Sequence, residues 1–186
     1  MRTMDARCEQ WVGSRLVAGV GDRRMSSTLH SIRECDTGDP RQRAQLIRLN
    51  QAWADTCGVA LASDHPTRLD TLLQEHPTLH VLLAFDESGH AFGYALCQFT
   101  ITSFGGSRSL NIHDIFIEEA WRGRGIGRAM IEAIERRARE ADCAKLTLEV
   151  DRVNTGAQRL YAELGFADGH DDSDGSGTWF WRKPLR

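Results

Sequence analysis

Several kinds of segment are missing from this sequence of 186 residues, and each absence removes a class of protein. No apolar run reaches the ~18 residues that a membrane-spanning helix needs. The run from Leu16 to Val20 is too short for the core of a secretion signal. The five cysteines are odd in number, and no Cys-x-x-Cys occurs, so we expect neither a disulfide framework nor a zinc site. These absences predict a cytoplasmic protein with reduced thiols and no membrane partner.

The sequence also has no excess of basic residues over acidic ones. The net charge is −3 and the sequence pI is near 6.2, whereas nucleic-acid binding depends on a basic surface, so we expect no nucleic-acid partner. Hydrophobic content of 41% is ordinary for a globular protein, and the length suffices for one α/β domain with a core. We place that domain at residues 28–186. Residues 1–27 show no clear periodicity, and we expect them to form a flexible extension.

Two segments with ligand-type residues do not predict a metal site. His76 and His80 are four residues apart, but Pro77 argues against a helix that would present both to one ion. Residues 170–175 are similar to a calcium loop, yet His170 and Trp181 occupy the positions where such a loop needs Asp and Glu. We expect a polar hairpin turn there and no metal in the protein.

The hydrophobic pattern predicts strands first and then alternating strands and helices. We expect strands at 29–34, 79–85, 92–102, 110–117 and 146–150, and a closing hairpin of 166–168 with 178–183. Helices are expected from Pro40 to about Cys57, at about 67–74, at 125–141 and at 154–164. This order implies an α/β fold whose mixed sheet is mostly antiparallel, with parallel neighbours where helix 125–141 crosses over.

The loop between strand 110–117 and helix 125–141 is rich in glycine and arginine. It reads Arg122-Gly-Arg-Gly-Ile-Gly127 and feeds a helix N-terminus, where free N–H groups and the helix dipole favour a phosphate. A dinucleotide fingerprint starting at Gly123 would need glycine where Arg128 stands, and no Gly-Lys-Ser/Thr of a Walker loop occurs. A glycine-rich connection without a ligand is the simpler alternative.

The flanks of this loop resemble the GNAT superfamily of acyl-CoA N-acyltransferases. The first motif is Ile112 to Met130, IHDIFIEEAWRGRGIGRAM, and the second is LTLEV at 146–150 followed by NTGAQRLYAELGF at 154–166. The strand at 92–100, the Gly-Gly turn and His113-Asp114 are most similar to the diamine (polyamine) acetyltransferase branch. The resemblance spans roughly residues 29–184. It implies a GNAT-type sheet flanked by helices, with the parallel strand pair at the CoA site.

The resemblance also implies a set of site residues. Acetyl-CoA would pair through its pantetheine with the backbone of Ile115, Phe116 and Ile117, and its pyrophosphate would meet the loop residues Arg122, Gly123, Arg124, Gly125, Ile126, Gly127 and Arg128. Tyr161 matches the tyrosine that protonates the departing thiolate in many relatives, although a helix tyrosine packed in the core is the simpler reading. Asn154 matches a residue that contacts the cofactor, and Asn is also a preferred N-cap.

His113 and Asp114 interrupt the otherwise apolar run of strand 110–117 and are our candidates for a general base. Alternation along a strand sends them to opposite faces, so we expect at least one to face the cleft. A base is useful because an alkyl amine, with a pKa of about 10.4, is protonated at pH 7. In the polyamine-acetylating relatives the first position is commonly glutamate, so His113 departs from their pattern. Either residue, or a structural role for both, remains open.

Together these features predict an acetyl-CoA-dependent N-acetyltransferase that acts on a small-molecule amine by direct transfer in a ternary complex. No cysteine or serine lies in a motif that calls for a covalent acyl-enzyme. The alternatives are a protein or peptide acetyltransferase and a non-catalytic acyl-CoA sensor. The segment 57–77, which contains Asp64, Asp70 and Glu75, is expected on the acceptor side. A homodimer is left open.

Overall fold

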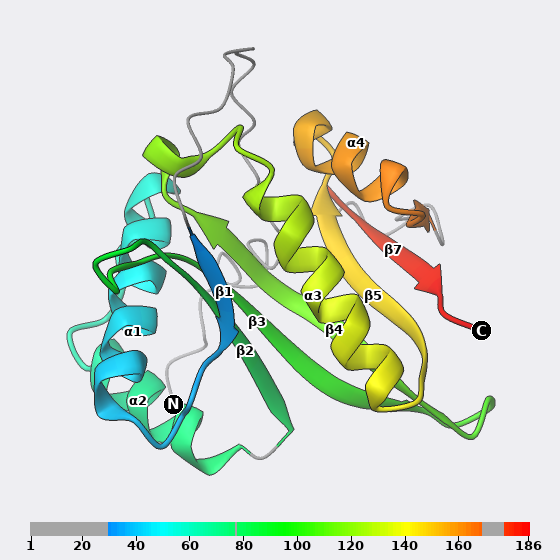
Figure 1. Cartoon of the computed structure of the whole chain (residues 1–186), viewed down its shortest axis with the longest axis horizontal. Helices are drawn as coiled ribbons and strands as arrows, with labels where there is room; N and C mark the ends of the chain where they lie inside the picture. Colours follow the sequence, from blue (N-terminus) through cyan, green and yellow to red (C-terminus); the bar gives the residue numbers. More distant parts are fainter. Residues whose placement is uncertain (1–29, 77, 169–176) are drawn as a thin grey trace, which may run out of the picture.

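The computed structural model describes residues 30–76, 78–168 and 177–186. The expected extension at residues 1–27 and the polar turn at 170–175 lie outside these ranges. Figure 1 shows the elements, which follow one another as β1 (Ser31–Glu34), α1 (Pro40–Thr56), α2 (His65–Glu75), β2 (Leu79–Phe85), β3 (Ala91–Thr102), β4 (Ser107–Ile117), the 3₁₀ turn η2 (Glu119–Trp121), α3 (Ile126–Glu140), β5 (Cys143–Asp151), α4 (Thr155–Glu163), β6 (Ala167–Asp168) and β7 (Thr178–Pro184).

One mixed sheet connects all the strands, in the order β1-β2-β3-β4-β5-β7-β6. Every neighbouring pair is antiparallel except β4 and β5, which are parallel. The parallel pair requires a crossover connection, and α3 supplies it. The predicted mixed sheet and the position of its parallel pair are therefore confirmed.

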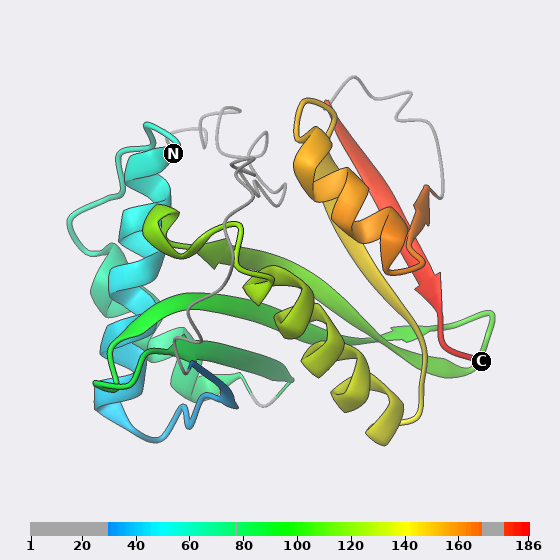
Figure 2. The same ribbon diagram turned by 45° about the horizontal axis from the view of Figure 1, so that its top comes forward.

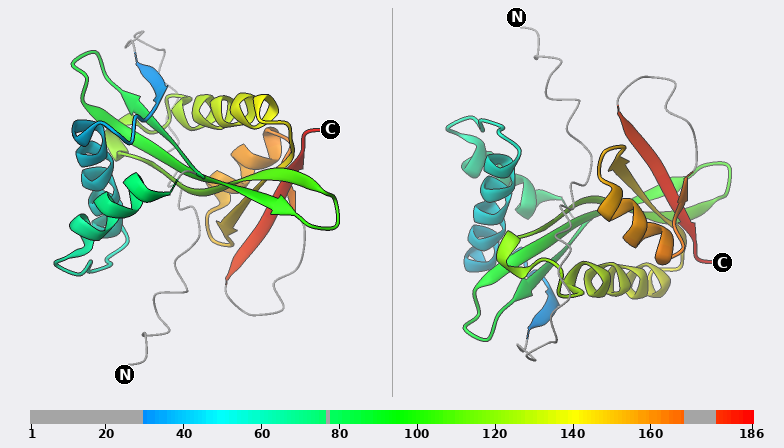
Figure 3. Two further views of the ribbon diagram at one scale, coloured as in Figure 1. Left: turned by 90° about the horizontal axis from the view of Figure 1, so that it is seen from below. Right: turned by 90° about the horizontal axis from the view of Figure 1, so that it is seen from above.

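The sheet separates two hydrophobic cores, because successive side chains of a strand point to opposite faces. One core lies under α1 and α2 and includes Leu46, Leu49 and Leu73; the other lies under α3 and α4. Figure 3 shows α1 and α2 on the opposite side of the sheet from α3. Helix α3 buries an apolar stripe at helical spacing, and each large side chain of it stabilises the fold by roughly 1.5–3 kcal/mol; the stripe comprises Ile126, Met130, Ile131, Ile134 and Ala138.

Most predicted bounds agree with the structure to within about one residue, and four starts need correction. Strand β1 begins at Ser31 rather than Leu29, and strand β5 begins at Cys143 rather than Leu146, because its pairing with β4 already starts there. Helix α2 begins at His65 rather than Thr67, because Pro66 fits the first turn of a helix, where its missing N–H has no partner to lose. Strand β4 begins at Ser107 rather than Leu110, because the hairpin with β3 continues almost to its Gly-Gly turn. The hydroxyl groups of Thr102 and Ser107 lie 2.8 Å apart beside that turn.

None of the helices in the described ranges is both long and apolar enough to cross a bilayer. Within the same ranges, no three side chains of His, Cys, Asp or Glu converge as ligands for a metal ion.

Candidate active site

Strands β4 and β5 lie side by side for only part of their length. Their pairing runs as far as Ile112 opposite Leu148. Beyond that row, β4 remains paired with β3 up to Ile117 and β5 remains paired with β7 up to Asp151. The two strands therefore part, as Figures 1 and 2 show. One edge of the last part of β4 thus opens onto a notch in the sheet, and this part includes the predicted cofactor-pairing residues 115–117.

The glycine-rich loop lies at the open end of this notch, because it follows β4 directly. Gly123 and Gly125 have φ values of 73° and 77°, in the left-handed region that residues with a side chain rarely adopt. Helix α3 then begins at Ile126, and no described side chain caps its N-terminus. The N–H groups of its first turn, together with the positive end of the helix dipole, form a site suited to an anion.

The three loop arginines have different surroundings. The Nε of Arg122 donates to the carbonyl oxygen of Ile117 at 2.8 Å, and its guanidinium lies 5.8 Å from the centroid of the Phe116 ring. Arg128 forms an ion pair with Glu163, which joins the start of α3 to the end of α4. Arg124 is exposed, and its guanidinium lies over the ring of Trp121.

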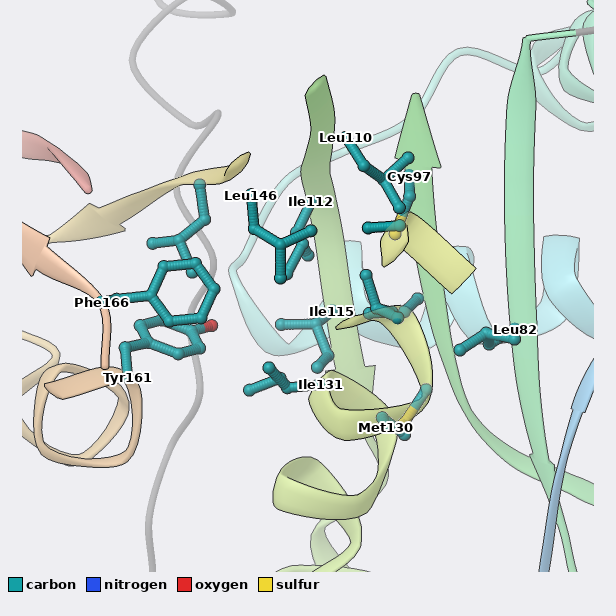
Figure 4. Close-up of a cluster of buried hydrophobic side chains, with 14 of the residues drawn as sticks. Leu82, Cys97, Leu110, Ile112, Ile115, Met130, Ile131, Leu146, Tyr161 and Phe166 are labelled. Carbon is teal, nitrogen blue, oxygen red and sulfur yellow. The ribbon is translucent and has the colours of Figure 1, made fainter. Parts of the chain in front are cut away.

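Tyr161 lies on α4 and is completely buried in the core beneath α3 and α4. Its ring packs against Phe166, with 5.8 Å between the ring centroids. Figure 4 shows the hydroxyl directed toward Ile115 of β4, the strand that borders the notch. The simpler alternative, a helix tyrosine packed in the core, fits this burial as well, although the hydroxyl does not reach the surface. The placement is compatible with the predicted proton donor.

Asn154 has the structural role that its residue type suggested. Its side-chain oxygen accepts a hydrogen bond from the N–H of Ala157 at 3.1 Å, which caps the N-terminus of α4. The residue is 9% exposed and follows β5 closely, so it lies near the same notch.

The two adjacent polar residues of β4, His113 and Asp114, lie where the pairing of β4 with β3 shifts its register. The alternation of side chains along a regular strand did not predict this shift. Leu96 of β3 pairs with Asp114 while Cys97 pairs with Ile112, so His113 is an extra residue in β4, a β-bulge. Bulges re-aim side chains, and here His113 is exposed while Asp114 is half-buried. The bulge lies directly after the last row that joins β4 to β5.

Burial raises the pKa of Asp114 to about 6, because desolvation disfavours the charged carboxylate; the nearby His113 acts in the opposite direction. The negative charge of the Asp114 carboxylate also affects the pKa values of two residues on β3. Burial and then Asp114 raise the pKa of Tyr94 well above its usual value, and the same two causes raise the pKa of the Cys97 thiol. At pH 7 Asp114 is thus ionised but more basic than an ordinary aspartate.

Three residues near Asp114 were not singled out from the sequence. The hydroxyl of Tyr94 accepts a hydrogen bond from the side-chain amide of Asn50 at 3.1 Å, and Trp53 packs edge-on against the Tyr94 ring. Tyr94 could have been found, because it lies two positions before the cross-strand partner of Asp114. Asn50 and Trp53 carry no comparable signal, since only the docking of α1 brings them there.

In the segment 57–77, which was expected on the acceptor side, Asp64 and Asp70 are paired with arginines of the protein itself. The Asp70 carboxylate accepts from the Nε of Arg43 at 2.7 Å, which ties α2 to α1, and Asp64 pairs with Arg68 within α2. A polar cavity of about 400 Å³ lies at the other end of α3, where Arg108 and Arg186 line it. That cavity is remote from the loop, so it is not part of the candidate active site.

Comparison with known proteins defines the class of this fold and site. Residues 29–166, well over half of the chain, match the Acetyltransferase (GNAT) family. The chain belongs to this family and is an acyl-CoA-dependent N-acetyltransferase.

Three individual proteins illustrate the similarity, at sequence identities of 30% or less. The chain is 30% identical to the thialysine N-epsilon-acetyltransferase of Bos taurus over 144 residues, which cover 74% of this chain and 84% of the relative. A GNAT-family acetyltransferase from Staphylococcus aureus superposes with a TM-score of 0.67 at 14% identity, covering 85% of this chain and all of that one. A chain of the NatC complex bound to Gag peptide and CoA gives a TM-score of 0.66 at 19% identity, covering 84% and 99%. The two solved structures show the fold.

Proposed function

We propose that this enzyme transfers an acetyl group from acetyl-CoA to the primary amine of a small molecule, by direct attack in a ternary complex. The observation that carries the proposal is the notch between β4 and β5, which has an uncapped helix N-terminus at its mouth and Asp114 on its border. A thioester held along the edge of β4 would bring its carbonyl next to the bulge. The amine would approach from the side of Asp114.

The described residues fit acetyl-CoA in two respects. The edge of β4 at Ile115, Phe116 and Ile117 offers backbone groups to the amides of pantetheine, as an added strand would. The first-turn amides of α3 and the loop with its two left-handed glycines fit the pyrophosphate. Acetyl-CoA is the cosubstrate used by the family, and these two features support the same use here.

Asp114 is the stronger candidate for the base. Its raised pKa of about 6 matches a group that is ionised at pH 7 and still accepts a proton effectively. His113 is exposed on the bulge, whereas Asp114 is half-buried and its charge reaches Tyr94 and Cys97. In the reaction the amine nitrogen attacks the thioester carbonyl carbon, its proton passes to Asp114 directly or through a water molecule, and the C–S bond breaks.

Tyr161 would supply the proton that the departing thiolate takes up. Its hydroxyl is buried and directed toward β4, so a thiolate formed in the notch would lie in an environment of low polarity. There a phenol is a competent donor, because an unsolvated thiolate is a strong base. Nucleophile, base and donor are thus separate groups, and the reaction needs no covalent acyl-enzyme.

The preference for a small acceptor rests on the thialysine-acetylating relative, of which the chain covers 84%. It is tested by incubating the full chain with acetyl-CoA and a panel of diamines, amino acids and short peptides, with products detected by mass spectrometry. We expect acetylated small amines. Products from peptides alone would favour the peptide alternative, and CoA binding without any product would favour a sensor.

A further inference from the structure

The polar cavity at the far end of α3 has no part in the proposed reaction. Its volume of about 400 Å³ falls within the range of roughly 300–1,000 Å³ that small-molecule sites occupy. It lies at the end of α3 opposite to the glycine-rich loop (Figure 1). Segments far apart in the sequence supply its lining, namely Gly106, Ser107 and Arg108 at the start of β4, Ala141 and Asp142 after α3, and Arg186.

Hydrogen bonds within the protein hold the walls of this cavity. The hydroxyl of Ser107 lies 2.8 Å from that of Thr102, which also donates to the carbonyl oxygen of Ser107 at 2.9 Å. On the other side, the N–H of Leu185 donates to the carbonyl oxygen of Ala144 at 2.9 Å, and Arg139 donates to the carbonyl oxygen of Leu185 at 2.8 Å. The β3–β4 turn and the C-terminal segment are therefore both fixed by contacts outside the cavity itself.

The two arginines of the lining differ in what they bind. Arg186 forms an ion pair with the Asp142 carboxylate and donates to the carbonyl oxygen of the same residue at 2.8 Å. Arg108 is exposed, and within the described ranges its guanidinium has no ion pair and no hydrogen bond. One arginine of the cavity is thus occupied by the protein, while the N–H donors of the other are available to a ligand.

Positive charge exceeds negative charge around the cavity. Cys143, the first residue of β5, reports this balance: burial raises the pKa of its thiol most, Asp142 raises it further, and Arg108, Arg137 and Arg186 lower it. Three cations therefore act there against one anion. The C-terminal end of α3 adds the equivalent of about half a negative charge, which leaves the balance positive.

We propose that this cavity binds a small oxyanion, a phosphate or a carboxylate, and that Arg108 is its principal ligand. A planar guanidinium can donate two parallel hydrogen bonds to either group. Arg108 pairs with Cys143 in the first row that joins β4 to β5. A bound anion would tie this end of the parallel strand pair to Arg186, whereas the notch opens at the other end. The site is separate from the glycine-rich loop and does not depend on the proposed reaction.

The test follows backbone amide chemical shifts while inorganic phosphate or citrate is added to the full chain at constant ionic strength. Each amide reports the site in which it lies, so Gly106 reports this cavity and Gly125 reports the glycine-rich loop. Arg108→Met should weaken phosphate binding at Gly106 by about 10- to 100-fold, as for a lost charge-assisted hydrogen bond. Arg136→Met is the control, since it removes an exposed arginine of α3 outside the cavity and should leave this affinity unchanged.

Asp142→Asn supplies a prediction of opposite sign. Asp142 has a φ of 56°, and Asn tolerates this left-handed conformation about as well as Asp, so the backbone is retained. The change removes the carboxylate that competes for Arg186, and phosphate should bind several-fold more tightly. Unchanged or weaker binding would overturn the electrostatic basis of the site. Equal losses in Arg108→Met and Arg136→Met would reveal general charge screening only, and the absence of any shift at Gly106 would overturn the site.

The two probes distinguish the chemical classes of ligand. A response of Gly106 to phosphate alone assigns a phosphate site, a response to citrate alone assigns a carboxylate site, and similar affinities for both assign a general oxyanion site. Each of these results supports the proposal only when Arg108→Met removes the response.

Discussion

Ile112 and Leu148 form the last row in which β4 and β5 lie side by side, and the site begins where this row ends. Both side chains are buried in the core beneath α3 and α4, so the row is fixed by packing. Directly after it, β4 carries its bulge and β5 turns away with β7. The opening of the sheet is therefore built into the strand pairing.

The loop assignment predicts that charge at Gly125 blocks the cofactor. Gly125 has a φ of 77°, and a Cβ there would meet no atom within 4 Å, so a side chain would strain the backbone without a clash. Asn and Asp tolerate this region about equally well. Gly125→Asp should weaken acetyl-CoA binding at least about tenfold more than Gly125→Asn, a difference of about 1.4 kcal/mol. Equal affinities in calorimetry would contradict the assignment.

Tyr161→Phe tests the proton donor. The substitution keeps the ring that packs against Phe166 and removes only the buried hydroxyl. We expect kcat to fall by about 10²–10⁴-fold, as for lost general acid catalysis, while acetyl-CoA affinity changes little. Steady-state kinetics and calorimetry on the same preparation check this, and wild-type turnover would leave the tyrosine a purely structural residue.

The pH dependence of kcat/KM distinguishes the two candidate bases. With Asp114 as the base, kcat/KM should rise as the pH rises through about 6, where the carboxylate becomes ionised. Asp114→Asn should abolish this limb and His113→Gln should retain it. The reverse pattern would make His113 the base, and two unchanged profiles would show that neither residue removes the proton.

The same carboxyl group should make stability depend on pH. Asp114 has its pKa raised from 3.8 to about 6 in the folded protein, so its contribution is fully present below pH 3.8 and is lost as the pH rises through about 6. At 1.36 kcal/mol per pH unit the loss is at most about 3 kcal/mol. Asp114→Asn should therefore be more stable than the wild type at pH 8, with the gap closing near pH 4. Denaturant unfolding at both pH values measures it.

Two substitutions distinguish the capping role of Asn154 from its predicted contact with the cofactor. Asn154→Ala removes the acceptor for the N–H of Ala157 and should destabilise the protein by about 1 kcal/mol. Asn154→Asp retains a good cap and adds a negative charge near the notch. If the residue contacts the cofactor, the Asp variant should keep its stability and lose affinity for acetyl-CoA. Unaltered affinity would restrict Asn154 to capping α4.

The order of the elements and the position of the glycine-rich loop were readable from the sequence alone. Apolar residues spaced three and four apart predict helix α3, and the glycines Gly123 and Gly125 indicate where that helix begins. These are local signals, because periodicity and left-handed backbone conformations depend on residues close together in the chain. For the same reason Asn154 could be recognised as a cap before its partner was known.

Tertiary structure decided what depends on contacts between distant segments. The bulge at His113 arises from the pairing of β4 with β3, and nothing within the β4 sequence marks an extra residue. The partners of the loop arginines are likewise remote: Glu163 of α4 holds Arg128, while Phe92 of β3 supports the Trp121 on which Arg124 rests. The loop sequence gave three equivalent cations. Packing gave them different surroundings: Arg122 and Arg128 bind groups of the protein, and Arg124 lies exposed over the Trp121 ring.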